Sequence, residues 1–127
     1  MIEGMIQTEP QNVIAWSGLG ESLSELGHKK QGIVAYREAL QIDPNNVAVL
    51  ISTGIAYADL KQFDQAIVAF REALQIDPNN ARAWFQLGII YSMQGNHDGV
   101  IEAYQSLLTL DPVEAEKLFN LAIAPPD

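Results

Sequence analysis

Few residues in this sequence have side chains that could do chemistry. The 127 residues include no cysteine, which excludes a thiolate nucleophile, a disulfide and a thiolate metal site together. The two histidines, His28 and His97, stand far apart in the chain, so we expect them not to share a metal. Glu21 and Glu25 are one helical turn apart, but they would act as an acid/base pair only in a water-poor pocket. The glycines form no phosphate-binding loop, and the sequence therefore predicts no enzyme, no metal and no cofactor.

The charge of the chain limits the kinds of partner it can bind. The formal net charge is −9, and the seven Lys and Arg residues are scattered along the sequence. Nucleic acids and anionic membrane surfaces are bound by clustered basic residues, so both are disfavoured. A cationic partner, or an apolar one with basic flanks, fits this charge better.

The sequence also lacks the signals that direct a chain into or across a membrane. No stretch reaches the roughly 18 to 20 apolar residues that a membrane span needs. The first residues, Met1 to Met5, have neither a basic region nor a long apolar one, as a secretory signal would. We therefore expect a cytoplasmic protein by default.

An acidic residue followed by proline recurs every 34 residues along the whole chain. The four dipeptides are Glu9-Pro10, Asp43-Pro44, Asp77-Pro78 and Asp111-Pro112. The ten residues from Arg37 to Asn46 also recur unchanged from Arg71 to Asn80. A fixed period of this length indicates a repeat architecture. It divides the chain into three repeats, at residues 13–46, 47–80 and 81–114.

Each repeat has the pattern of two helices separated by a short break. Glycine within a helix costs about 1 kcal/mol relative to alanine, so Gly20, Gly54 and Gly88 predict close approach of a neighbouring helix backbone. The breaks carry Gly27, Lys61 and Gly95, where a helix would end on a left-handed residue. Proline then ends the second helix. The asparagines that follow proline, at Asn12, Asn46 and Asn80, are predicted caps of the next helix.

These motifs resemble the tetratricopeptide repeat (TPR) family over essentially the whole chain. The resemblance rests on Trp16-x2-Leu19-Gly20-x2-Leu23 and Trp84-x2-Leu87-Gly88-x2-Tyr91, with alanines and prolines in register. It implies an all-α fold, a right-handed α-solenoid of antiparallel helix pairs in which the first helices line the concave side.

The two ends of the chain are interpreted as partial repeats of a single domain. Residues 1–12 are expected to be the remnant of a preceding helix, with Ile2, Met5 and Ile6 at its apolar positions. Residues 115–124 are expected to form a C-terminal capping helix, followed by a tail at 125–127. Gly99 lies inside the last second helix, which we therefore expect to be the least regular helix of the chain.

The family resemblance also assigns the residues that line the concave groove. The predicted partner-binding groove consists of Ile14, Ser17, Glu21, Glu25, Ile51, Ser52, Ile55, Asp59, Arg82, Phe85, Gln86, Ile89 and Met93. Co-chaperone TPR domains hold a peptide carboxylate with a clamp of Lys, Asn and Arg at five of these positions. This sequence has Ser17, Glu21, Ser52, Arg82 and Gln86 there, so only Arg82 could contribute and the clamp is predicted to be absent.

The predicted groove is therefore an apolar strip with an acidic rim. Contiguous apolar surface usually marks an interaction site. We expect a protein–protein interaction scaffold or adaptor that binds a peptide or helix in this groove. The alternative is a structural self-assembly unit, a homo-oligomer whose groove or open helical ends contact another copy of the chain.

Overall fold

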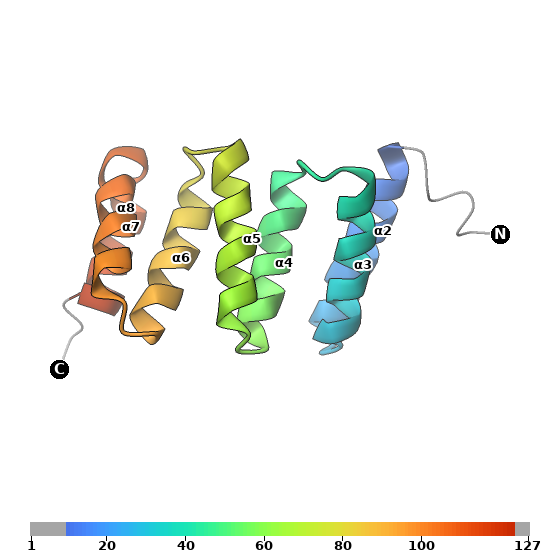
Figure 1. The fold of residues 1–127 in the computed structure, drawn as a ribbon, viewed down its shortest axis with the longest axis horizontal. Coiled ribbons are helices and arrows are strands. Elements are labelled where there is room, and N and C mark those ends of the chain that lie inside the picture. The colour runs from blue at the N-terminus through green and yellow to red at the C-terminus, as the bar shows by residue number, and fades with distance from the viewer. Residues whose placement is uncertain (1–9, 124–127) are drawn as a thin grey trace. The chain divides into compact units, whose positions relative to one another are not determined.

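The computed structural model describes residues 10–123, which are helical apart from short connections and contain no strand. Along the chain the helices are α2 (Pro10–Glu25), α3 (Lys29–Ile42), α4 (Val47–Asp59), α5 (Phe63–Ile76), α6 (Ala81–Met93), α7 (His97–Leu110), α8 (Pro112–Leu118) and the π-helical η1 (Phe119–Ile123) (Figure 1). The chain forms two compact units, unit 1 (Met1–Ala69) and unit 2 (Phe70–Asp127), and each is described by itself. None of the described helices is long and apolar enough to span a bilayer.

Unit 1 is built on the antiparallel pair α2 and α3, with α4 packed mainly against α3 (Figure 1). The apolar side of α3 is buried at Ile33, Tyr36 and Ala39. The two helices approach closely where each has a glycine. A Cβ atom on Gly20 would lie 2.6 Å from the Tyr36 ring and 3.0 Å from the carbonyl oxygen of Gly32. This confirms the predicted close approach at Gly20.

Unit 2 contains the pair α6 and α7, with α8 and η1 packed against both helices (Figure 1). Its core includes Ala103 and Leu107 of α7 together with Ala115 and Leu118 of α8. A Cβ atom on Gly88 would lie 2.6 Å from the Leu118 side chain. The nearest atoms to Gly88 are therefore side-chain atoms of Leu118 and Ala103, and not the neighbouring helix backbone that was predicted for this position.

Most of the predicted helix ends have the expected chemistry. The Asn46 side chain accepts a hydrogen bond from the Val49 N–H at 3.1 Å, and Asn80 accepts one from Ala83 at 3.0 Å. Both asparagines are thus N-caps, which satisfy an N–H that has no partner within the helix. Asn12 is not a cap, because α2 already begins at Pro10 and Asn12 is buried within it. The residues at the breaks all have positive φ, at 91° for Gly27, 62° for Lys61 and 73° for Gly95.

The C-terminal part of unit 2 departs from the prediction in two ways. The capping helix begins at Pro112 and not at Ala115, because the Asp111 side chain accepts a hydrogen bond from the Glu114 N–H and proline suits the first helical turn. The last described turn at this end of the chain is π-helical.

At the other end of the chain, the predicted remnant at residues 1–12 lies largely outside the described residues.

The expectation that α7 is the least regular helix is wrong. Gly99 lies in its first turn, where its N–H donates to the capping side chain of Asn96 at 3.0 Å. A Cβ atom on Gly99 would lie 2.6 Å from the Tyr91 ring, so this glycine also serves the packing of α7 on α6. The helix continues as a single α-helix from His97 to Leu110.

Candidate functional site

In unit 1 the predicted groove residues lie on α2 and α4 and differ widely in exposure. Ile14, Glu21, Glu25 and Asp59 are exposed, whereas Ser17, Ser52 and Ile55 are half-buried. Ile51 is only 3% exposed and so offers no surface to a partner. Ile51 is assigned to the groove by its position in the repeat alone, and that position does not say which neighbouring residues cover the side chain.

In unit 2 the predicted groove residues all lie on α6. Phe85, Ile89 and Met93 follow one another at intervals of four residues, which places them on one face of the helix. Phe85 and Ile89 are half-buried against the core of unit 2, while Met93 is 65% exposed. Arg82 is exposed and Gln86 half-buried. This strip of α6 is the most apolar part of the predicted site.

The acidic rim in unit 1 is weaker than the sequence suggests. The Asp59 carboxylate lies 3.2 Å from the Lys29 ammonium of α3, which offsets its charge. Glu21 and Glu25 form no ion pair with another residue of the described part of the chain. Burial raises the pKa of the Tyr36 hydroxyl, and the charges of Glu21 and Glu25 raise it further, against the lowering effect of hydrogen bonds with Ser24 and Ser52.

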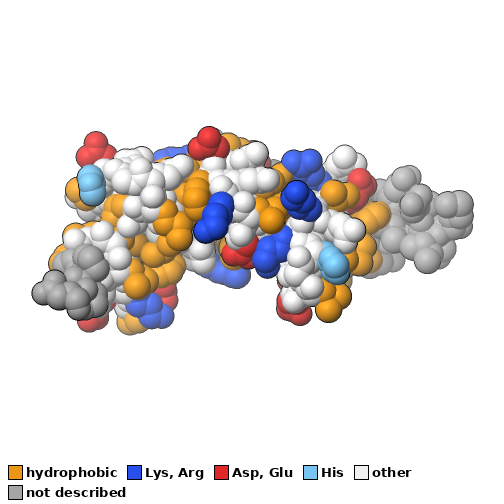
Figure 2. Space-filling model, turned by 90° about the horizontal axis from the view of Figure 1, so that it is seen from below, with side chains coloured by type: hydrophobic (Ala, Val, Ile, Leu, Met, Phe, Trp, Pro, Cys, Tyr) orange, Lys and Arg blue, Asp and Glu red, His pale blue; other side chains and the backbone are white. Residues whose placement is uncertain are grey.

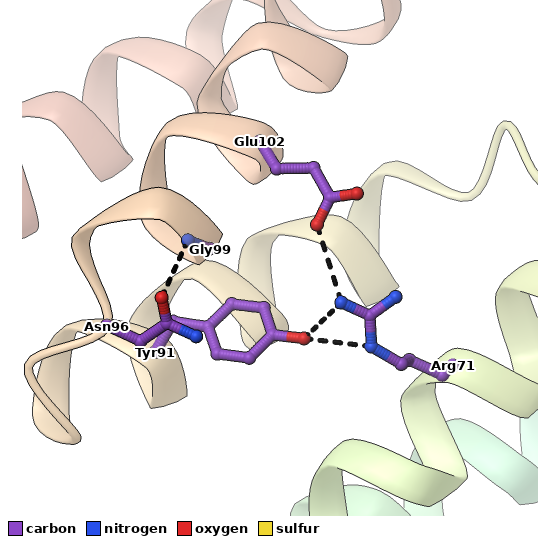
Figure 3. A network of polar contacts seen from close by, with 5 residues as sticks. All are labelled: Arg71, Tyr91, Asn96, Gly99 and Glu102. Carbon is purple, nitrogen blue, oxygen red and sulfur yellow. Dashed lines mark hydrogen bonds and ion pairs between the residues drawn. The ribbon is translucent and has the colours of Figure 1, made fainter.

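An arginine from a second helix contacts a tyrosine of the next first helix in each unit. The Arg37 guanidinium of unit 1 donates to the Tyr57 hydroxyl and lies 5.9 Å from the ring centroid. In unit 2 the Arg71 Nε–H donates to the Tyr91 hydroxyl at 2.9 Å (Figure 3). Each contact holds the hydroxyl of a buried tyrosine of α4 or α6 against the preceding second helix.

Sequence reasoning missed these pairs, although a signal was present. The separation from Arg37 to Tyr57 equals that from Arg71 to Tyr91, and all four residues lie in the repeat register. Unit 2 adds Glu102, whose carboxylate lies 3.4 Å from Arg71 (Figure 3). Burial lowers the pKa of Arg71, but the Tyr91 hydrogen bond and the nearby Glu102 outweigh it and the net shift is upward.

The histidines lie at helix starts and not in a catalytic arrangement. His28 precedes α3 and His97 begins α7, and both are exposed. A hollow of about 430 Å³ lies beside His28, with a lining that includes Lys29, Lys30 and Leu60. Lysine or arginine and histidine side chains are visible over α3 on the face drawn in Figure 2. Residues 10–123 contain no group of three or more His, Asp or Glu side chains placed to hold a metal ion.

The packed helix pairs define an all-helical repeat protein. The model of the tetratricopeptide repeat matches residues 13–46 and 81–112, and a second model, of the TPR repeat, matches residues 54–95. The chain therefore belongs to the TPR family. Comparison with curated protein sequences finds no match.

Solved structures of TPR proteins are similar to this chain. The crystal structure of MamA protein is 26% identical with a TM-score of 0.79, over 89% of this chain, and this chain spans only 63% of its length. The first TPR of Spaghetti (RPAP3), solved with the HSP90 peptide SRMEEVD, is 21% identical with a TM-score of 0.82, over 93% of this chain and 96% of its own. The Arabidopsis OM64 TPR domain is 18% identical with a TM-score of 0.78, over 84% of this chain and 89% of its own. The last two likenesses concern the fold alone.

Proposed function

We propose that this chain is a non-catalytic scaffold whose first helices bind a peptide or a helix of a partner protein. The observation that carries the proposal is the strip of Phe85, Ile89 and Met93 on α6, which is apolar and leaves Met93 largely exposed. Membership of the TPR family supports a role in protein–protein interaction, and a relative of the same fold was solved with a bound peptide.

The size of the strip suggests a modest affinity. Full burial of one such side chain stabilises a complex by about 1.5–3 kcal/mol. Association first costs at least about 4 kcal/mol in lost freedom of motion. Phe85 and Ile89 are already half-buried in unit 2, so a partner gains less from them than from Met93. We expect binding in the micromolar range.

The charges near the groove positions argue for basic flanks in the partner and against an acidic C-terminal tail. Of the five positions that would form a carboxylate clamp, only Arg82 is cationic, and Glu21 would repel a carboxylate. Within unit 1, the exposed Glu21 and Glu25 favour Lys or Arg in a segment that lies along α2. Because Asp59 already pairs with Lys29, we expect it to contribute less.

The proposal is tested by selecting, from a library of displayed peptides, those that bind the full chain. Met93→Glu should lower the affinity of the chain for the selected peptides at least about tenfold, because it places a charge on the apolar strip. Met93 is exposed, so the fold should tolerate the change. Ile101→Glu, at an exposed position of α7, is the matched control and should bind like the wild type. If the two variants bind the selected peptides equally well, the α6 strip is not the site.

A further inference from the structure

The hollow beside His28 brings together basic residues from two turns of unit 1. Its lining comes from the turn between α2 and α3, from the first residues of α3 and from Leu60 at the end of α4. The lining residues include Lys29 and Lys30, and Lys61 follows Leu60 directly in the chain. Lysine or arginine side chains are visible over this part of unit 1 in Figure 2. We call this cavity of about 430 Å³ the basic hollow.

The basic hollow has an excess of positive charge in a chain that is acidic as a whole. The net charge of the chain is −9, yet three of its seven Lys and Arg residues, Lys29, Lys30 and Lys61, lie at these two turns. Lys29 pairs with Asp59 at 3.2 Å, whereas Lys30 and Lys61 form no ion pair within residues 10–123. The exposed Glu25 at the end of α2 can offset only one of these two ammonium groups. Positive charge is therefore left for a ligand.

Lys30 reverses the charge that the other repeats have at its position. The equivalent residues are Asp64 in α5 and Asp98 in α7, each in the first turn of its helix. The helix dipole favours an acidic residue there and disfavours a lysine. The start of α3 thus lacks a stabilising charge and has a cation at the basic hollow in its place. Such a departure from the repeat is expected where a side chain serves a ligand and not its own helix.

The kind of cation at the basic hollow indicates the class of ligand. Its described lining has lysines and no arginine. The planar fork of arginine matches a carboxylate, whereas a lysine ammonium is a point charge that suits phosphate. A phosphate monoester carries a charge of about −1.5 to −2 at neutral pH, so it gains more from several ammonium groups than a carboxylate does. We propose that the basic hollow binds a phosphate monoester, carried by a small molecule or by a phosphorylated side chain. This site lies in unit 1 and does not depend on the α6 strip of unit 2.

Titration of the full chain with inorganic phosphate, followed by backbone amide chemical shifts, tests the proposal. Saturable shifts are expected at residues 27–31 and at Leu60, which line the basic hollow. Lys30→Gln should weaken phosphate binding about two- to fivefold, the range of an exposed ion pair. Lys117→Gln removes the same charge from α8, outside the lining, and should leave binding unchanged. Asp59→Asn should strengthen binding, because it releases Lys29 from its ion pair.

A tripeptide with a central phosphoserine distinguishes the two sources of the phosphate. Tighter binding of the tripeptide than of inorganic phosphate assigns the basic hollow to a phosphorylated side chain, and equal or weaker binding assigns it to a small molecule. The same tripeptide with glutamate at its centre should bind more weakly than the phosphorylated one, and equal binding of the two overturns the proposal. Absence of saturable shifts at the basic hollow also overturns it. So does an equal effect of Lys30→Gln and Lys117→Gln, because the phosphate then responds only to the net charge of the chain.

Discussion

Unit 1 and unit 2 each have a glycine at the same repeat position of their first helix, but the glycine meets different neighbours. Gly20 faces the Tyr36 ring and the backbone of Gly32 in the paired helix, whereas Gly88 faces Leu118 of α8 and Ala103 of α7. Val100 stands in unit 2 where unit 1 has Gly32. The absence of a side chain is thus required at both places for different reasons. A repeat register predicts where space is short but not which atoms fill it.

The largest effect is expected where the neighbour cannot move. We predict that Gly20→Ala lowers the free energy of unfolding of unit 1 by about 1–3 kcal/mol, because the new Cβ would overlap a buried ring and a carbonyl oxygen. Urea unfolding followed by tryptophan fluorescence measures this, since Trp16 reports on unit 1 and Trp84 on unit 2.

A control in the same helix and a counterpart in unit 2 sharpen this comparison. Gly18 has no atom within 4 Å of its Cβ position, so Gly18→Ala should stabilise by up to about 1 kcal/mol through helix propensity. Gly88→Ala should cost less than Gly20→Ala, because the end of the Leu118 side chain can shift. Equal costs for Gly20→Ala and Gly88→Ala would show that the neighbours do not matter in this way.

The arginine–tyrosine pairs are predicted to differ between the units by a smaller amount. Tyr91→Phe removes the acceptor of two Arg71 N–H groups, and Tyr57→Phe removes the acceptor of one from Arg37. We expect Tyr91→Phe to lower the free energy of unfolding by about 1 kcal/mol and Tyr57→Phe to lower it by less, because fewer hydrogen bonds are lost. Both losses stay small because both arginines are partly solvated. The same unfolding measurements apply, and a larger loss for Tyr57→Phe would contradict the expected order.

Substitutions at the breaks between helices should change the stability of the two units in opposite directions. Lys61 of unit 1 has a left-handed backbone that costs a side chain about 1 kcal/mol, so Lys61→Gly should stabilise unit 1 by about that much. Gly95→Ala should destabilise unit 2 by a similar amount, because Gly95 already has this conformation. Thermal unfolding of each variant gives the sign directly, and a destabilising Lys61→Gly would refute the expectation.

The smallest effect concerns pH. Burial raises the pKa of Tyr36 in the folded protein above its ordinary value of 10.0. The unfolded chain therefore loses this proton first, so the contribution to stability is present below about pH 10 and is lost as the pH rises through the folded pKa. Unfolding free energies measured from pH 8 to 11 should fall at the upper end by less for Tyr36→Phe than for the wild type. An identical fall for both would contradict the prediction.

The sequence predicted the helix pairs because their signals are local and repeat. Proline, the glycines at the breaks and the capping asparagines act on their own backbone, so Asn46 and Asn80 have the expected role. Asn12 does not, because α2 starts before it. Gly99 does not disturb α7 because it lies in the first turn, where Asn96 caps its N–H, and the general cost of glycine within a helix does not include this position.

The candidate site was less predictable because exposure depends on neighbours and not on register. Ile51 and Ile55 occupy groove positions of the same helix, yet only Ile51 is fully buried. The sequence places Asp59 on the acidic rim, but it pairs with Lys29 of α3, the second helix of the preceding repeat. Neither contact can be derived from a 34-residue period, because it depends on side-chain lengths and directions. The residues of the groove accordingly stay a prediction.

The joint at Asp111 has a consequence for how such repeats can be recombined. The backbone N–H of Asp111 donates to Leu107 at the end of α7, while its side chain caps the start of α8. At the earlier boundary these two roles belong to separate residues, Asp43 and Asn46, with exposed Pro44 and Asn45 between them. An insertion between Asp43 and Asn46 would leave both capping residues in place, but it would break the hydrogen bonds that Asn46 donates to the Asp43 carbonyl at 3.3 Å and to the Asp43 carboxylate at 3.4 Å. At Asp111 a single residue makes both capping contacts, so an insertion there would keep only one of them. We therefore expect an insertion to be better tolerated at the earlier boundary.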